Sequence, residues 1–259
     1  TETFDMHASH VSLVAVSALS LVWLGACQAT DKTPEPTSSA SEAAPTAFQL
    51  RLPPKPDDLT EILETLEADT SGTLGFPTRH AYDFSILLKD FESAPEMNGL
   101  GHLYLPESAE GPVPAMVILH GSGGIKDGRE HDYAELFAAN GIAGFVVDYY
   151  IPRGVTPDTP YGMKTMVATE TDVIVDAYAA LDFLASHPGI NGERIGVIGF
   201  SYGGMGTRYT LDDRLAQILS PEGNRFAAHA DFYGPCHQTL GHDGTTGAPY
   251  LAVFGDNDN

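Results

Sequence analysis

The sequence has few cysteines and few basic residues. It contains 2 cysteines, Cys27 and Cys236, and 13 Lys and Arg against 35 Asp and Glu, which gives a formal net charge of -22. Two cysteines cannot build the disulfide framework that holds many small secreted domains together. Nucleic acid and anionic membrane surfaces repel so negative a chain, so the charge argues against both as partners. We interpret the charge as a strongly solvated acidic surface.

The apolar run at residues 11–26 is short for a membrane span, which needs about 20 residues. Its length is typical of the core of a signal peptide. The run leads into Leu-Gly-Ala-Cys at residues 24–27, which resembles a bacterial lipobox. By this resemblance residues 1–27 are a signal peptide and Cys27 receives a lipid, with an ordinary secretory signal as the alternative. We therefore expect a bacterial envelope protein, either lipid-anchored at Cys27 or secreted to the periplasm.

Residues 28–56 are rich in Pro, Thr, Ser and Ala and predict a flexible linker. Residues 57–259 predict one globular domain, in which helices and strands alternate. This alternation indicates an α/β fold with a mostly parallel, doubly wound sheet. Helices are predicted at 58–67, 133–140, 171–186 and 202–219, the last with a break near 212–213. Strands are predicted at 81–88, 100–105, 113–119, 142–148, 195–200, 226–232 and 250–254, the first two antiparallel.

The strand predicted at 195–200 leads into Gly-Phe-Ser-Tyr-Gly at residues 199–203. A Gly-x-Ser-x-Gly sequence between a strand and a helix is typical of a nucleophile elbow, a strained turn that lifts the serine hydroxyl clear of the sheet. Gly199 and Gly203 leave room for the neighbouring strand and helix. The pattern therefore predicts Ser201 as a catalytic nucleophile.

A second glycine-rich turn, His-Gly-Ser-Gly-Gly at residues 120–124, follows the strand predicted at 113–119. Glycines leave backbone N–H groups uncovered, so the amides of Gly121 and Ser122 can face a substrate oxygen. Together with the amide of Tyr202 they form a predicted oxyanion hole, in which losing one donor typically costs about 2.7–4 kcal/mol. The alternative is a plain glycine-rich turn between strand and helix.

From Thr78 onward the chain resembles the dienelactone hydrolase family of the α/β-hydrolase superfamily. The resemblance rests on the motifs at residues 119–124, 147–154, 199–204 and 232–236. It implies hydrolysis of an ester or lactone, a small-molecule substrate, through an acyl-enzyme and without metal or organic cofactor. The enzymes that name the family use a cysteine nucleophile and an acidic residue in the loop after the early strand. This chain has Ser201 and, in that loop, Gly121, so we expect a serine-esterase mechanism and a substrate other than dienelactone.

In this fold the catalytic residues follow the order Ser, acid, His along the chain. Asp258, in a Gly-x-x-Asp turn after the strand at 250–254, resembles the family's acid, with Asp256 as the alternative and turn capping as a third possibility for both. The histidine is expected beyond Asn259, where this sequence ends, so the sequence resembles a C-terminally truncated fragment. The histidines at positions 120, 229, 237 and 242 precede the acid and break the order. We therefore expect negligible esterase turnover from residues 1–259.

Arg153 follows the strand at 142–148, at the edge where ligands bind in such sheets. It is a candidate to contact an anionic group of the substrate, and a solvated loop arginine is the alternative. Two rival functions stay open. One is a peptidase or acyltransferase on the same fold, since both also form acyl-enzymes. The other is a non-catalytic, surface-tethered binding protein.

Overall fold

The computed structural model describes residues 61–257, except residues 64, 127 and 238. The predicted signal peptide, the lipidation site Cys27, the predicted linker and the candidate acid Asp258 lie outside the described residues. Among the described residues, no helix combines the length and the apolar character that crossing a membrane requires.

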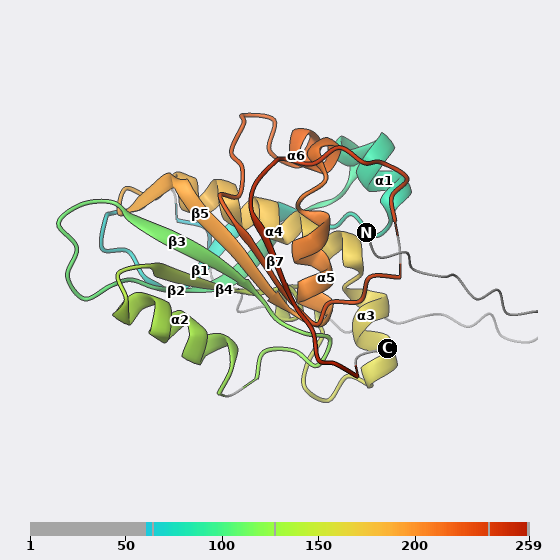
Figure 1. The fold of residues 1–259 in the computed structure, drawn as a ribbon, viewed down its shortest axis with the longest axis horizontal. Helices are drawn as coiled ribbons and strands as arrows, with labels where there is room; N and C mark the ends of the chain where they lie inside the picture. Colours follow the sequence, from blue (N-terminus) through green and yellow to red (C-terminus); the bar gives the residue numbers. More distant parts are fainter. Residues whose placement is uncertain (1–60, 64, 127, 238, 258–259) are drawn as a thin grey trace, which may run out of the picture. The chain divides into compact units, whose positions relative to one another are not determined.

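A seven-stranded sheet with the order β1-β2-β4-β3-β5-β6-β7 forms the centre of the domain (Figure 1). Its strands are β1 (Gly72–Arg79), β2 (Glu96–Tyr104), β3 (Val113–Leu119), β4 (Ala143–Asp148), β5 (Ile190–Phe200), β6 (His229–Phe232) and β7 (Tyr250–Val253). β2 pairs antiparallel with both β1 and β4, and every pair from β4 through β7 is parallel. The mostly parallel sheet of an α/β-hydrolase fold is therefore confirmed.

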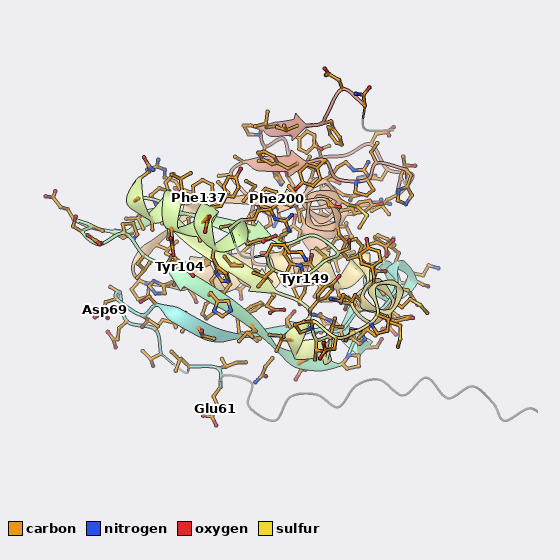
Figure 2. All side chains as sticks on the ribbon, turned by 90° about the horizontal axis from the view of Figure 1, so that it is seen from below. Glu61, Asp69, Tyr104, Phe137, Tyr149 and Phe200 are labelled. Atoms are coloured by element: carbon orange, nitrogen blue, oxygen red, sulfur yellow. The ribbon has the colours of Figure 1, made fainter. Side chains whose placement is uncertain are left out.

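Helices cover both faces of the sheet (Figure 1). They are α1 (Phe84–Lys89), α2 (Glu130–Ala139), α3 (Tyr161–Val167), α4 (Glu170–Ala185), α5 (Tyr202–Tyr209) and α6 (Asp213–Leu219). On one face, α2 packs over an apolar cluster that includes Ile118, Val146 and Phe200, with Phe137 of α2 against it (Figure 2). On the other face, α4 and α5 cover the larger cluster. The central strands are thus buried on both sides, as parallel strands normally are.

Several predicted elements are confirmed in detail. All six residues of β4 are buried, as expected for its continuous apolar sequence. The long helix at 171–186 is α4, and it begins where the Asp172 carboxylate accepts a hydrogen bond from the Thr169 amide, at 2.9 Å. The predicted break near 212–213 separates α5 from α6, where the Asp212 side chain accepts from the Arg214 and Leu215 amides of α6.

Two predictions near the start of the domain are wrong. The apolar segment at 81–88 is not a strand, because Asp83 caps a helix there, α1, and the first strand lies earlier, as β1. The described residues of the segment 58–67 form no helix, and Ile62 instead bridges the backbone of Gly75 beside β1. The segment 81–88 is a short apolar run, in which the hydrophobic period does not separate helix from strand, whereas the segment 58–67 has helical spacing that its pairing with β1 overrides. Helix α3 was not predicted.

Candidate active site

Ser201 occupies the turn between β5 and α5 in a strained conformation. Its backbone has φ 53° and ψ -110°, and among the described non-glycine residues only Ser201 and Tyr233 have positive φ. The Ser201 amide donates to the Phe232 carbonyl and its carbonyl accepts from the Met205 amide, both at 2.9 Å. A backbone of this kind costs about 1–3 kcal/mol and persists only where its surroundings hold it. The elbow geometry predicted around Ser201 is therefore present, with the serine side chain half-buried.

The glycines on either side of Ser201 allow close packing rather than positive φ. A Cβ on Gly203 would lie 2.3 Å from the Leu119 carbonyl oxygen, and one on Gly199 would lie 2.1 Å from the Gly203 oxygen. The first turn of α5 therefore rests directly on the end of β3. Any side chain at Gly203 would push the helix away and displace Ser201 with it.

The two glycine-rich turns lie side by side. β3 and β5 are parallel neighbours with Leu119 opposite Gly199, so both turns leave the sheet at the same edge. A Cβ on Gly121 would lie 3.6 Å from the Ser201 Cβ and 3.2 Å from the Phe200 carbonyl oxygen. The structure thus brings Gly121 and Ser122 next to the predicted nucleophile.

Two tyrosines hold the carbonyl groups of the loop after β3. The Tyr149 hydroxyl donates to the His120 carbonyl, and the Tyr149 ring stacks on the His120 ring with centroids 3.6 Å apart. The Tyr150 hydroxyl donates to the Ser122 carbonyl at 2.8 Å. The sequence analysis did not assign this role to Tyr149 and Tyr150. Their position directly after β4, at the same edge of the sheet, was the available signal.

These contacts fix the orientation of the peptide groups in the loop after β3. The Gly121 carbonyl is also occupied, since it accepts from the Gly124 amide at 2.9 Å. In a planar trans peptide the next N–H points opposite to the carbonyl, so the N–H groups of Gly121, Ser122 and Gly123 face away from these partners. Within the described chain no backbone carbonyl accepts from these three amides. The Tyr202 amide, in the first turn of α5, likewise has no acceptor inside its own helix.

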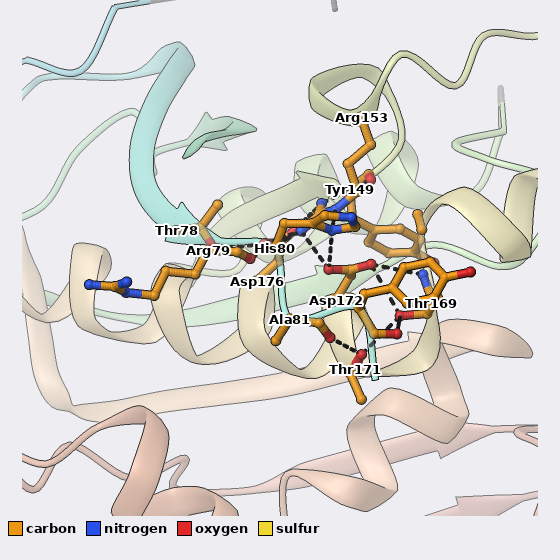
Figure 3. A network of polar contacts seen from close by, with 12 residues as sticks. Thr78, Arg79, His80, Ala81, Tyr149, Arg153, Thr169, Thr171, Asp172 and Asp176 are labelled. Atoms are coloured by element: carbon orange, nitrogen blue, oxygen red, sulfur yellow. Dashed lines mark hydrogen bonds and ion pairs between the residues drawn. The ribbon is translucent and has the colours of Figure 1, made fainter. Parts of the chain in front are cut away.

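Arg153 lies in a buried ion-pair cluster (Figure 3). This position corrects both predictions made for it, a contact with a substrate anion and a solvated loop arginine. Its side chain is 3% exposed, and Nη1 lies 2.6 Å from Asp176 Oδ2 while Nη2 lies 3.3 Å from Asp172 Oδ1. Nη1 also donates to the Tyr149 carbonyl at 3.0 Å. Asp172 and Asp176 stand one turn apart on α4, so one guanidinium reaches both. Arg153 is therefore neither solvated nor free to bind a substrate anion.

The two carboxyl groups of the cluster differ, because burial raises the pKa of Asp176 above its ordinary value in spite of Arg153. Burial alone raises the pKa of the Asp172 carboxyl, but the Arg153 charge and a hydrogen bond from His80 outweigh burial and hold that pKa below its ordinary value. The cluster ties the turn after β4, which carries Tyr149 and Tyr150, to α4. It therefore supports the loop after β3 through those tyrosines.

The structure does not identify a catalytic base for Ser201 among the described histidines. His229 stands opposite Val197 in the sheet, about 13 Å along the strand from Ser201, and burial lowers its pKa to about 4. The His120 ring is buried and its Nδ1 lies 2.8 Å from the Gly121 carbonyl oxygen. Within the described residues, no hydrogen bond joins a side chain to the Ser201 hydroxyl. That a histidine acts as the base stays a prediction, made from the order of the catalytic residues along the chain.

The strand register positions the candidate acids. Phe200, Phe232 and Val253 lie opposite one another in β5, β6 and β7. The turn after β7 therefore leaves the sheet at the same edge as Ser201. Asp256 is an exposed residue of that turn, and Asp258 is outside the described residues. Which of the two orients the base also stays a prediction.

Arg129, which precedes α2, is a residue beside the nucleophile that the sequence analysis missed. If Gly121 carried a Cβ, that atom would lie 3.6 Å from Arg129 Nη2 and 3.6 Å from Ser201 Cβ. The guanidinium forms an ion pair with Glu130, whose side chain is fully buried. No local motif signals this residue, because a loop brings it back to the end of β3.

One cluster in the described residues has metal-ligand chemistry: Asp212, Asp213 and His242. Its groups already have other partners. Asp212 accepts from the Arg214 guanidinium at 2.9 Å and from the Arg214 amide at 2.9 Å, while His242 lies against Asp213. We interpret the cluster as the cap of α6.

A cavity of about 1000 Å³ borders β1 and α4, and neither Ser201 nor the loop after β3 lines it. Several of its charged lining groups already have partners. Asp182 accepts from Ser220 at 2.6 Å and from Asn224 at 2.8 Å, and Arg79 lies 3.0 Å from Glu96. We therefore place the functional site at the Ser201 turn and not in this cavity.

The sheet order, the strained serine and the facing glycine loop define an α/β-hydrolase. The dienelactone hydrolase family model matches residues 100–259, and the chain belongs to that family. Family membership does not by itself fix the substrate.

Two curated relatives and one solved structure indicate the range of the family. The thiohydrolase aneE of Aspergillus aculeatus is 36% identical over 122 residues, which are 46% of this chain and 36% of that protein. A probable 2-oxo-3-(5-oxofuran-2-ylidene)propanoate lactonase of Bradyrhizobium sp is 30% identical over 98 residues, 36% of this chain and 39% of that protein. The match thus spans well under half the length of these relatives. The crystal structure of the dienelactone hydrolase-like promiscuous phosphotriesterase P91, from metagenomic libraries, superposes with a TM-score of 0.50 at 20% identity, covering 72% of this chain and 70% of that one, and so shares the fold.

Proposed function

We propose that the protein is a serine hydrolase that cleaves a carboxylic ester or lactone through an acyl-enzyme on Ser201. The observation that supports the proposal is the serine at positive φ, next to a glycine loop whose carbonyl groups already have hydrogen-bond partners. This arrangement supplies a nucleophile and a site for a developing oxyanion on one edge of the sheet.

The proposed reaction follows from the geometry. The base takes the proton of Ser201 Oγ as this oxygen attacks the carbonyl carbon. The carbonyl electron pair moves to the oxygen, which accepts hydrogen bonds from the Tyr202 amide and from the Gly121–Ser122 loop. The tetrahedral intermediate collapses, and the alcohol leaves with a proton from the base. Water then attacks the acyl-enzyme and releases the acid. The base is a histidine that follows the acid in chain order, and Asp258 or Asp256 orients it.

The strain at Ser201 favours catalysis over a purely binding role. A binding protein gains nothing from a serine at φ 53°, because a glycine there would relieve the strain. Peptidase and acyltransferase chemistry would use the same acyl-enzyme. We favour ester or lactone cleavage because one relative bears the name of a lactonase and another that of a thiohydrolase, and both names describe attack on an activated acyl group.

Product partitioning tests the acyl-enzyme. The full-length protein is supplied with phenyl butyrate or 4-nitrophenyl butyrate in water containing methanol, and methyl butyrate and butyrate are quantified. Both substrates form one butyryl-Ser201, so we expect the same ratio of the two products from each. A ratio that changes with the leaving group would contradict a shared covalent intermediate. Residues 1–259 alone should give negligible turnover, since no described histidine meets Ser201.

A further inference from the structure

Two histidines lie side by side where the start of α2 meets β2. His102 is in β2, and His131 is the second residue of α2. Their ring centroids are 5.3 Å apart, and the ring planes are inclined by 71°. Two imidazoles on one tetrahedral metal ion, with metal–nitrogen bonds of about 2.0–2.1 Å, have centroids about 5 Å apart. The separation of the two rings therefore fits a shared metal ion.

A hydroxyl group lies beside Nδ1 of each ring. His102 Nδ1 is 3.0 Å from Thr73 Oγ1. His131 Nδ1 is 2.9 Å from the hydroxyl oxygen of Tyr104, which lies beside α2 (Figure 2). When each Nδ1–H donates to its hydroxyl oxygen, the lone pair of the imidazole is on Nε2. Metal-binding histidines usually have such a partner on the other ring nitrogen, which fixes the tautomer and the orientation of the ring.

The Nε2 atoms of both rings are available to a ligand. Within the described residues no hydrogen bond involves Nε2 of His102 or of His131, and both residues are half-buried. Burial and, to a smaller extent, the neighbouring His131 lower the pKa of His102, although the charge of Asp148 opposes this shift. His102 is therefore neutral at pH 7, which is the form that binds a metal ion.

The surroundings of the pair favour a cation. The charge of Asp148 acts on His102, and the charge of Glu135 acts on the Tyr104 hydroxyl. The whole chain has a formal net charge of -22, and a negative field raises the local concentration of cations. In the described part of the chain no third His, Cys, Asp or Glu forms a three-ligand group with the two rings. Water would therefore complete the coordination of an ion bound here.

The pair lies outside the site at Ser201. In the sheet, β2 is three strands from β5, a separation of about 14 Å. His102 lies opposite Val146, two residues before the end of β4. An ion bound by the pair would thus join β2 to the first turn of α2 and would not contact the nucleophile.

We propose that His102 and His131 bind one divalent transition-metal ion of the kind that prefers imidazole, such as Zn²⁺, Ni²⁺ or Cu²⁺, and that this ion links α2 to the sheet. Glu130, next to His131, accepts from the Lys126 amide at 2.9 Å, so the link also steadies the loop after β3. Affinity rises from Co²⁺ through Ni²⁺ to Cu²⁺. Mg²⁺ and Ca²⁺ prefer oxygen ligands and do not bind here.

Calorimetric titration of Ni²⁺ into the full-length protein tests the site. We expect His102→Gln and His131→Gln each to remove one bound ion per chain from the titration. Tyr104→Phe keeps both ligands but removes the hydroxyl beside His131, and it should weaken that binding by about tenfold or more. His242→Gln is the matched control, because His242 belongs to the cluster that caps α6, and it should leave this ion in place.

Thermal unfolding, followed by circular dichroism, tests the link between α2 and the sheet. We expect Ni²⁺ at about 1 mM to raise the Tm of the full-length protein by about 3 °C or more, and Mg²⁺ at the same concentration to leave it unchanged. The double variant His102→Gln with His131→Gln should lose the rise, whereas His242→Gln should keep it.

Several outcomes overturn the inference. Titrations of both single variants that match the unsubstituted protein contradict the site, as does loss of the ion in His242→Gln instead. A rise in Tm that survives the double variant contradicts the link. Circular dichroism checks the fold of each variant, and should His102→Gln unfold, His131→Gln at the start of the helix decides alone. Neither measurement uses an ester, so the result is independent of the proposed function.

Discussion

Replacing Ser201 with alanine is expected to lower kcat for ester hydrolysis by about 10⁴-fold or more, because the variant loses the group that forms the acyl-enzyme. The amides of Tyr202 and of the loop after β3 remain in place, so a weak residual activity from the oxyanion hole can persist. The measurement is steady-state hydrolysis of 4-nitrophenyl butyrate by the full-length protein, with circular dichroism to check the fold.

Ser122→Ala is the matched control for this prediction. Ser122 is proposed to act through its backbone amide, which alanine keeps. The substitution removes only the hydroxyl, whose partner is the Tyr161 hydroxyl at 2.7 Å. We expect a change in kcat of less than about tenfold. If Ser201→Ala behaves like Ser122→Ala, the nucleophile is not Ser201.

Replacing Arg153 with methionine is expected to lower the free energy of unfolding by about 3–5 kcal/mol. Methionine fills a similar volume but leaves Asp172 and Asp176 as uncompensated charges, and both carboxylates are fully buried. Urea denaturation at neutral pH, followed by circular dichroism, measures the change. The variant should also loosen the turn that carries Tyr149 and Tyr150.

Arg79→Met is the control for the buried cluster. Arg79 is 24% exposed, and its partner Glu96 is 81% exposed, so the pair is largely solvated. Such pairs contribute about 0–1 kcal/mol. A loss of stability no larger for Arg153→Met than for Arg79→Met would mean that the cluster does not support the fold. A selective rise in KM without any loss of stability would instead restore the substrate-binding role first predicted for Arg153.

The sequence predicted the parts of the site that are encoded locally. The turn at Ser201 and the loop at Gly121 are each marked by glycines within five residues. The two turns lie close together because their strands, β3 and β5, are parallel neighbours and so end at the same edge of the sheet. The buried β4 was predicted for a similar reason, because a continuous apolar run of its length suits a strand covered on both faces.

The parts that were missed depend on partners distant in the chain. Arg153 was placed at the right edge, but its pairing with Asp172 and Asp176 depends on how α4 packs against the turn after β4. Arg129 and Ser201 both lie beside Gly121 only because the loop that carries Arg129 returns across the end of β3. No spacing of residue types encodes either contact.

The early secondary structure was missed because of competing local signals. The segment at 81–88 has enough apolar residues for a strand, yet the Asp83 cap, accepting from the Ile86 amide at 2.9 Å, starts α1 inside it. Ile62 lies in a segment with helical spacing, but pairing with the backbone of Gly75 decides its conformation. In both segments a single backbone contact outweighs the hydrophobic pattern.

Covalent labelling with a fluorophosphonate tests the central claim most directly, because the probe requires a nucleophilic serine beside oxyanion donors. The full-length protein is treated, digested and analysed by mass spectrometry. We predict one adduct, on the peptide that contains Ser201, and none after unfolding in urea or in Ser201→Ala. Absence of an adduct on the folded protein, or an adduct on a different serine, would contradict the account.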